Sequence, residues 1–96
     1  MERRKTEELS AVILRFMRMS GLESPLNQYR LINSWTEVAG ELVAGHTTEI
    51  YIRNQILYVR ITLPALRANL MMNRKKLAAL LNHKVGANVI TDITFL

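Results

Sequence analysis

The chain has no cysteine, two prolines, four glycines and a single tryptophan among its 96 residues. The absence of cysteine excludes disulfide bonds, a thiolate nucleophile and a zinc ribbon. No apolar run approaches the roughly 18 residues that a membrane-spanning helix needs. The start of the chain, MERRKTEEL, carries charges of both signs and is unlike a signal peptide. We therefore expect a cytoplasmic protein that does not associate with membranes.

Acidic residues are scarce in the second half of the chain. Residues 1–50 hold six basic and seven acidic side chains, whereas residues 51–96 hold seven basic side chains and one acid, Asp92. The net charge of +5 therefore comes from the second half. A basic region of this kind attracts polyanions or acidic partner surfaces, although the same charge also serves solubility alone.

The length is that of one ordinary domain. Hydrophobic residues make up 49% of the chain and charged residues 22%, which is typical of a globular protein. We expect a single domain over residues 1–96, with an N-terminal helix and connection over 1–24 and a core over 25–96.

The spacing of apolar residues predicts the order of elements. Helices are predicted from Thr6 to Gly21, from Ser24 to Gly40 and from Pro64 to Val85, with a short helical turn over 41–44. The period changes from 3.6 to 2 in TTEIYIRNQILYVRITL, which predicts a β-hairpin turning at Asn54-Gln55, and NVITDITFL predicts a third strand. The order α-α-β-β-α-β indicates an α+β fold with helices on one face of a three-stranded mixed sheet. The order of the strands in the sheet stays open.

Two of the predicted helices carry an apolar stripe that we expect to be buried. The stripe of the second helix consists of Leu26, Tyr29, Ile32, Trp35, Val38 and Ala39. The stripe of the long helix consists of Leu66, Leu70, Leu77, Leu80 and Leu81, interrupted by Asn73.

The stretch NSWTEVAGELVAGHT could catalyse, bind a metal or reverse the chain. Trp35 continues the apolar spacing of the second helix, which predicts a core anchor, with an exposed stacking platform as the alternative. Gly40 and Gly45 predict helix ends, and their spacing fits no phosphate-binding loop. His46 lies at a helix-to-strand corner, where its ring can hold a backbone carbonyl. The stretch is therefore predicted to reverse the chain.

The sequence offers no set of residues for catalysis or for a metal. The two histidines, His46 and His83, have neither cysteine nor an acidic cluster beside them, so they make a poor metal site. No nucleophile, base and orienting acid can be nominated together. We expect no enzyme activity, no metal and no cofactor.

The basic residues and two tyrosines remain as candidate contacts to nucleic acid. Interleaved arginine and tyrosine suits base stacking combined with phosphate contacts, and it equally suits the ordinary solvated face of an antiparallel sheet. Arg67, Arg74 and Lys75 are expected on one side of the long helix. The candidates are Arg67, Arg74, Lys75 and Lys76 on the predicted long helix, and Tyr51, Tyr58, Arg53 and Arg60 on one face of the hairpin.

The order of these features resembles the DciA family. The resemblance rests on W-x-x-V-A-G-x-x-x-A-x-H-T from Trp35, I-Y-I-R-N-x-x-L-Y-V from Ile50, A-L-R-A-N-L from Ala65, L-L-N-x-x-V-G from Leu80, and V-I-T-D-I-T-F from Val89. It covers about Leu26 to Leu96 and is strongest to the short single-domain forms of Bacteroidetes.

The resemblance implies a KH-like fold and a role with the replicative DnaB-type helicase, whose loading on DNA family members assist while binding DNA themselves. KH domains clamp the nucleic-acid backbone with a GxxG loop, and this sequence has none, so that binding mode is not expected. Longer family members carry a tail that contributes to DNA and helicase contacts, so we expect weak DNA affinity from this form. The expected partners are the helicase and single-stranded DNA or another nucleic acid. A protein adaptor without direct nucleic-acid binding is the alternative, and the oligomeric state is left open.

Overall fold

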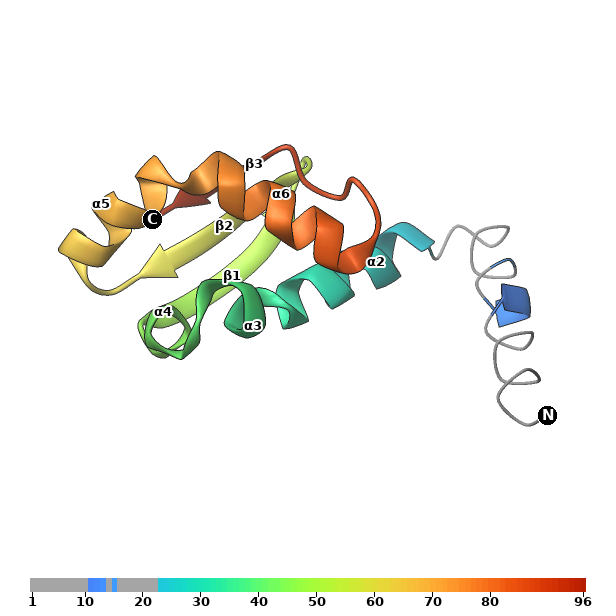
Figure 1. Cartoon of the computed structure of the whole chain (residues 1–96), viewed down its shortest axis with the longest axis horizontal. Coiled ribbons are helices and arrows are strands. Elements are labelled where there is room, and N and C mark those ends of the chain that lie inside the picture. The colour runs from blue at the N-terminus through green and yellow to red at the C-terminus, as the bar shows by residue number, and fades with distance from the viewer. Residues whose placement is uncertain (1–10, 14, 16–22) are drawn as a thin grey trace.

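The chain folds into a three-stranded sheet with a layer of helices on one side, in a computed structural model that describes residues 11–13, 15 and 23–96 (Figure 1). Residues 11–13 and 15 are helical, and the rest of the predicted Thr6–Gly21 helix lies outside the described residues. The elements that follow are α2 Glu23–Asn33, α3 Trp35–Ala39, α4 Glu41–Gly45, β1 Thr47–Arg53, β2 Ile56–Ile61, α5 Pro64–Met72, α6 Arg74–Val85 and β3 Asp92–Phe95. The predicted α+β class and its order of elements are confirmed.

The sheet is mixed, as predicted, and its strand order is β1-β2-β3. β1 pairs with β2 antiparallel, and β2 pairs with β3 parallel. Asn54 and Gln55 turn the hairpin with φ of 52° and 65°, the left-handed conformations of a primed two-residue turn. The third strand is shorter than predicted, because pairing with β2 begins only at Asp92.

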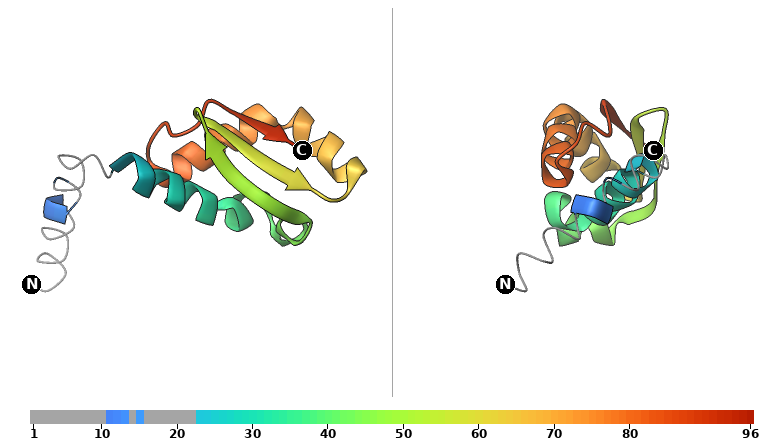
Figure 2. Two further views of the ribbon diagram at one scale, coloured as in Figure 1. Left: turned by 180° about the vertical axis from the view of Figure 1, so that it is seen from behind. Right: turned by 90° about the vertical axis from the view of Figure 1, so that its right-hand side faces the viewer.

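The helices cover one face of the sheet and leave the other open (Figure 2). Apolar residues alternate onto the covered face, where Leu57, Val59 and Ile93 are almost fully buried. Trp35 is 3% exposed, and its ring centroid lies 6.1 Å from that of Phe95. The buried core consists of Leu31, Trp35, Val43, Leu57, Val59, Ile61, Leu70, Ala78, Leu81, Val85, Ile90, Ile93 and Phe95.

Two helices that we predicted as continuous are each broken at a polar residue. At Ser34 the hydroxyl donates to the carbonyl of Arg30 at 2.8 Å, and at Asn73 the side-chain amide donates to the carbonyl of Asn69 at 3.1 Å. A side chain that bonds the carbonyl four residues earlier competes with the backbone N–H of the next turn and bends the helix. The predicted helices 24–40 and 64–85 are therefore divided into α2 and α3, and into α5 and α6.

Two members of the predicted apolar stripes are exposed, and these predictions were wrong. Tyr29 is 67% exposed and Leu80 is 46% exposed. A sheet of three strands supports only a narrow contact with each helix, so α6 buries Ala78, Leu81 and Val85 and turns Leu80 outward.

Within the described ranges, every helix is too short or too polar to cross a membrane.

Candidate nucleic-acid interface

The open face of the sheet carries a stacked pair of tyrosines. Tyr51 on β1 and Tyr58 on β2 are directly opposite in the register. Their ring centroids lie 5.0 Å apart with an interplanar angle of 14°. Arg53 and Arg60 alternate onto this same face, as the sequence predicts. The face therefore combines aromatic surface with positive charge.

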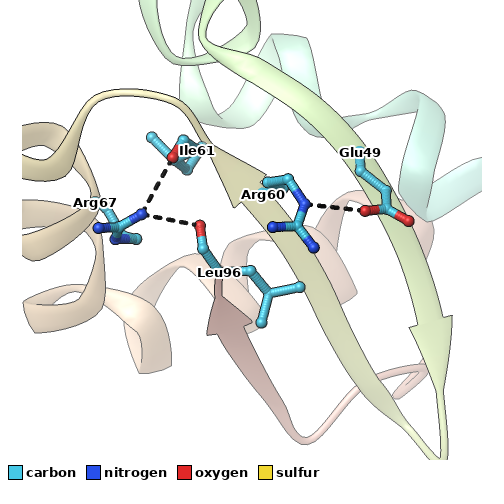
Figure 3. Close-up of polar contacts among 5 residues, drawn as sticks. All are labelled: Glu49, Arg60, Ile61, Arg67 and Leu96. Atoms are coloured by element: carbon cyan, nitrogen blue, oxygen red, sulfur yellow. Dashed lines mark hydrogen bonds and ion pairs between the residues drawn. The ribbon is translucent and has the colours of Figure 1, made fainter.

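One of the two arginines on this face is paired with an acid across the strands. The Nε of Arg60 donates to Oε2 of Glu49 at 3.1 Å, and the register sets the two residues opposite each other (Figure 3). Both side chains are about half exposed, and an exposed ion pair of this kind contributes only about 0–1 kcal/mol. The pair lowers the net positive charge at this end of the face.

At the β3 edge of the sheet, Asp92 lies between two basic side chains of α6. Its Oδ1 is 3.4 Å from Nε of Arg74, and its Oδ2 is 3.3 Å from Nζ of Lys75. The backbone N–H of Ile93 donates to Asp92 and lowers the pKa of this carboxyl, and Lys75 and Arg74 lower it further. Because the folded pKa is depressed, the ion pairs are complete at neutral pH and are lost only as the pH falls through that lowered pKa.

Arg53 and Lys76 make no ion pair with any residue that the structure describes. Arg53 ends β1 at the hairpin turn, and Lys76 lies in the first turn of α6; both side chains are exposed. Arg53 therefore adds positive charge to the face that carries the tyrosine pair, whereas Lys76 belongs to the helix layer that covers the other face (Figure 2).

Arg67 is placed differently from the other predicted basic contacts. Its Nη1 donates to the main-chain oxygens of Ile61, at 3.4 Å, and Leu96, at 3.3 Å (Figure 3). These oxygens lie at the ends of the parallel strands β2 and β3, so the half-buried guanidinium ties the two strand ends together. The break at Asn73 separates Arg67 from Arg74, and the expected single basic side of one helix does not form.

The NSWTEVAGELVAGHT stretch forms the corner that leads from the helices into β1. Trp35 Nε1 donates to Oγ1 of Thr47 at 3.1 Å, and this hydroxyl donates to the carbonyl of Val43 at 2.7 Å. Gly40 separates α3 from α4 with φ 97° and ψ 160°, a conformation that only glycine adopts without strain. Gly45 is the last residue of α4 rather than the residue after it.

His46 does not hold a backbone carbonyl with its ring, contrary to the prediction. Its Nδ1 lies 3.1 Å from Oγ1 of Thr62, and its own carbonyl accepts the backbone N–H of Thr62 at 3.0 Å. The histidine therefore links the start of β1 to the end of β2 through its main chain and its ring together.

The sequence model of the family described as "Dna[CI] antecedent, DciA" matches residues 8–95. The chain belongs to the DciA family. The UPF0232 protein of Corynebacterium glutamicum (strain R) is 26% identical over 90 residues, which cover 94% of this chain and 51% of that relative. The chain thus spans about half the length of the curated relative it matches. No solved structure matches this DciA-family chain.

Sequence reasoning missed three side chains that shape this DciA-family domain. Glu49 and Asp92 neutralise part of the basic surface, and Asn82 holds the loop between α6 and β3. The sequence does single out Asp92, since it is the one acidic residue among residues 51–96. Glu49 and Asn82 gave no comparable signal, because their partners are known only once the strand register and the loop path are known.

Proposed function

We propose that this domain is a non-enzymatic accessory of the replicative DnaB-type helicase that binds single-stranded DNA on the open face of its sheet. Membership of the DciA family supports the helicase role. The observation that carries DNA binding is the stacked Tyr51–Tyr58 pair, in which Tyr51 is 36% exposed and Tyr58 is partly buried, with Arg53 and Arg60 on the same face. We further propose that residues 1–96 act as one domain with its core in residues 25–96.

The proposed DNA contacts divide into stacking and charge. Tyr51 and Tyr58 would stack on successive bases, which is tolerant of sequence because every base has an aromatic face. The charge contacts to phosphates would come from Arg53 and Arg60 on the face, from Arg74 and Lys75, which contact Asp92 at its β3 edge, and from Lys76 in the same turn of α6. Arg67 is left out of this set because its guanidinium holds two main-chain oxygens.

The double variant Arg53→Glu/Lys75→Glu is expected to weaken binding of a labelled single-stranded oligonucleotide by about tenfold or more at low salt, since each phosphate contact also carries a share of counterion release. Fluorescence anisotropy at low and near-physiological salt measures this change. The double variant keeps Arg67 with its hydrogen bonds to main-chain oxygens, and it keeps Arg74 as an ion-pair partner of Asp92. The melting temperature should stay close to that of the wild type.

The matched control is Arg30→Glu/Lys84→Glu, which changes the net charge equally but on α2 and at the end of α6. It should weaken DNA binding much less. Tyr51→Ala separates stacking from charge, because it should reduce affinity while leaving the salt dependence unchanged. Equal losses from the two double variants would mean that only net charge matters and would overturn the proposed face. A wild type that does not bind even at low salt would remove DNA as a direct ligand.

Asp92→Asn is expected to strengthen binding of single-stranded DNA severalfold at low salt, because it releases Arg74 and Lys75 from their shared acid. Asparagine keeps an oxygen for the backbone N–H of Ile93, so the stability should change little. The control is Glu37→Gln, which removes the same charge from an exposed pair with Lys84 away from the sheet face. If both variants raise the affinity equally, the gain comes from net charge and not from the two α6 cations.

A protein adaptor that never touches nucleic acid is the second candidate. The pairing of Arg60 with Glu49, and of Arg74 and Lys75 with Asp92, favours it, because these acids lower the charge available for phosphate. In that case capture of the helicase would survive nuclease treatment and an excess of competing oligonucleotide, and the anisotropy experiment would show no binding.

A further inference from the structure

The outward face of α5 is apolar and exposed. Met72 is 83% exposed and Met71 is 45% exposed, and Ala65 and Ala68 on the same helix are also exposed. We call these four residues the α5 face. α5 lies at the end of the molecule opposite α2, beside the C-terminus (Figure 1).

The α5 face has the spacing of a helix that packs on another helix. Ala65, Ala68 and Met72 are separated by three and then four positions, and Met71 adjoins them. The opposite side of α5 faces the core, where Leu70 is buried and Leu66 packs against the core residues. No element in the described part of the chain packs on the α5 face, so this short helix has one buried and one uncovered apolar side.

The residue types on the α5 face favour a helix as the occupant. Alanine lets the backbone of a second helix approach closely, and methionine adapts its shape to the side chains that it meets. An exposed methionine pair beside alanines serves no packing purpose within the described residues. Contiguous exposed apolar surface of this kind marks interaction sites in soluble proteins.

The charge around the α5 face indicates the sign of the charge that a partner surface should carry. No aspartate or glutamate occurs between Glu49 and Asp92, so α5, α6 and their flanking loops carry no acid. The first turn of α6, directly after the face, holds Arg74, Lys75 and Lys76; Asp92 of β3 pairs with Arg74 and Lys75, and the three cations still exceed this one acid. An apolar strip beside a cluster of cations is complementary to an amphipathic helix whose polar flank is acidic.

We infer that the α5 face binds an acidic amphipathic helix of the replicative helicase. The identity of this partner rests on the proposed function, whereas the position and chemistry of the surface rest on the exposed methionines and alanines and the acid-free flank. This surface lies on α5, the helix after β2, and its apolar residues are distinct from the tyrosine pair that we propose for DNA, although both proposals draw on the cations of the first turn of α6.

The test uses the full chain and the purified DnaB-type helicase encoded in the same genome, with binding measured by titration calorimetry in the absence of DNA. Met72→Glu and Ala68→Glu are each expected to weaken the helicase complex by about tenfold or more, the loss that a central interface residue gives. Met72→Lys should cost less than Met72→Glu, because lysine suits an acidic helix. The matched control is Leu42→Glu, the same kind of change at a 70% exposed leucine of α4.

The outcomes separate the inference from the proposed function. Losses at positions 68 and 72, with Leu42→Glu near the wild-type affinity and all melting temperatures unchanged, support the α5 face. Wild-type affinity in Met72→Glu and Ala68→Glu would overturn the α5 face and leave the helicase role standing. Equal losses from lysine and glutamate at position 72 would overturn the acidic nature of the partner helix. A wild type that does not bind the helicase would overturn both the inference and the helicase role, while anisotropy still reports on DNA.

Discussion

Replacing Trp35 with alanine is expected to lower the free energy of unfolding by about 3–5 kcal/mol, the range for removing a buried aromatic side chain. The side chain is 3% exposed and lies against Phe95 of β3. Its Nε1 also begins the chain of hydrogen bonds that runs through Thr47 to the carbonyl of Val43. The change therefore opens a cavity between α3 and the sheet and leaves the Thr47 hydroxyl without its donor.

Urea unfolding followed by circular dichroism measures this loss, because the variant has no tryptophan left for fluorescence. Trp35→Phe keeps an aromatic ring and removes the indole donor, so it should cost less than the alanine change. A domain of this size is typically stable by about 5–15 kcal/mol, and Trp35→Ala should therefore lie near the limit of folding. A loss below about 1 kcal/mol would show that the tryptophan does not anchor the core.

Much of the sheet could be predicted because its signals are local. Alternation between apolar and polar residues in residues 47–62 gave both strands and their faces, and Asn54-Gln55 gave the turn. Tyr51 and Tyr58 were therefore assigned to one face from the sequence alone. Their stacking at 5.0 Å depends on the register, which the turn length sets.

The helix breaks could not be predicted, because they depend on where a side-chain hydrogen bond competes with the backbone. Ser34 and Asn73 both occur inside long apolar patterns, and both residues are tolerated in helices when their side chains point to solvent. Only the bonds to the carbonyls of Arg30 and Asn69 show that the breaks form. The break at Asn73 matters for the site, since it separates Arg67 from the cations of α6.

The residue types of the candidate interface could be found from the sequence, but their neighbours could not. Basic side chains were expected to be available, whereas Glu49 and Asp92 pair with three of them. These partners are separated by 11 to 18 positions in the chain and meet only through the register and the crossover to β3. Arg67 was assigned to the surface for the same reason, because its acceptors on Ile61 and Leu96 come together only when β2 and β3 pair.

Replacing Asn82 with alanine is expected to lower the free energy of unfolding by about 2–4 kcal/mol, on the basis of about 1 kcal/mol for each of several hydrogen bonds. Its Oδ1 accepts the backbone N–H groups of Val89 and Ile90, at 3.0 and 3.1 Å, and its Nδ2 donates to the carbonyl of Ile90 at 2.7 Å. One side chain on α6 thus satisfies three main-chain groups of the loop that leads into β3. The change leaves these partly buried groups without partners.

The control for Asn82→Ala is Asn88→Ala, the same change at an exposed asparagine of the same loop, which should be close to neutral in urea unfolding. Asn82→Asp adds a finer comparison, because it keeps the acceptor for both N–H groups but turns the donor into a carboxylate oxygen facing the carbonyl of Ile90. Equal stability of the two alanine variants would mean that the loop holds its path without Asn82. If the expected loss is found, Asn82 also sets the position of Asp92 two residues beyond Ile90, and through it the position of Arg74 and Lys75 at the edge of the proposed DNA face.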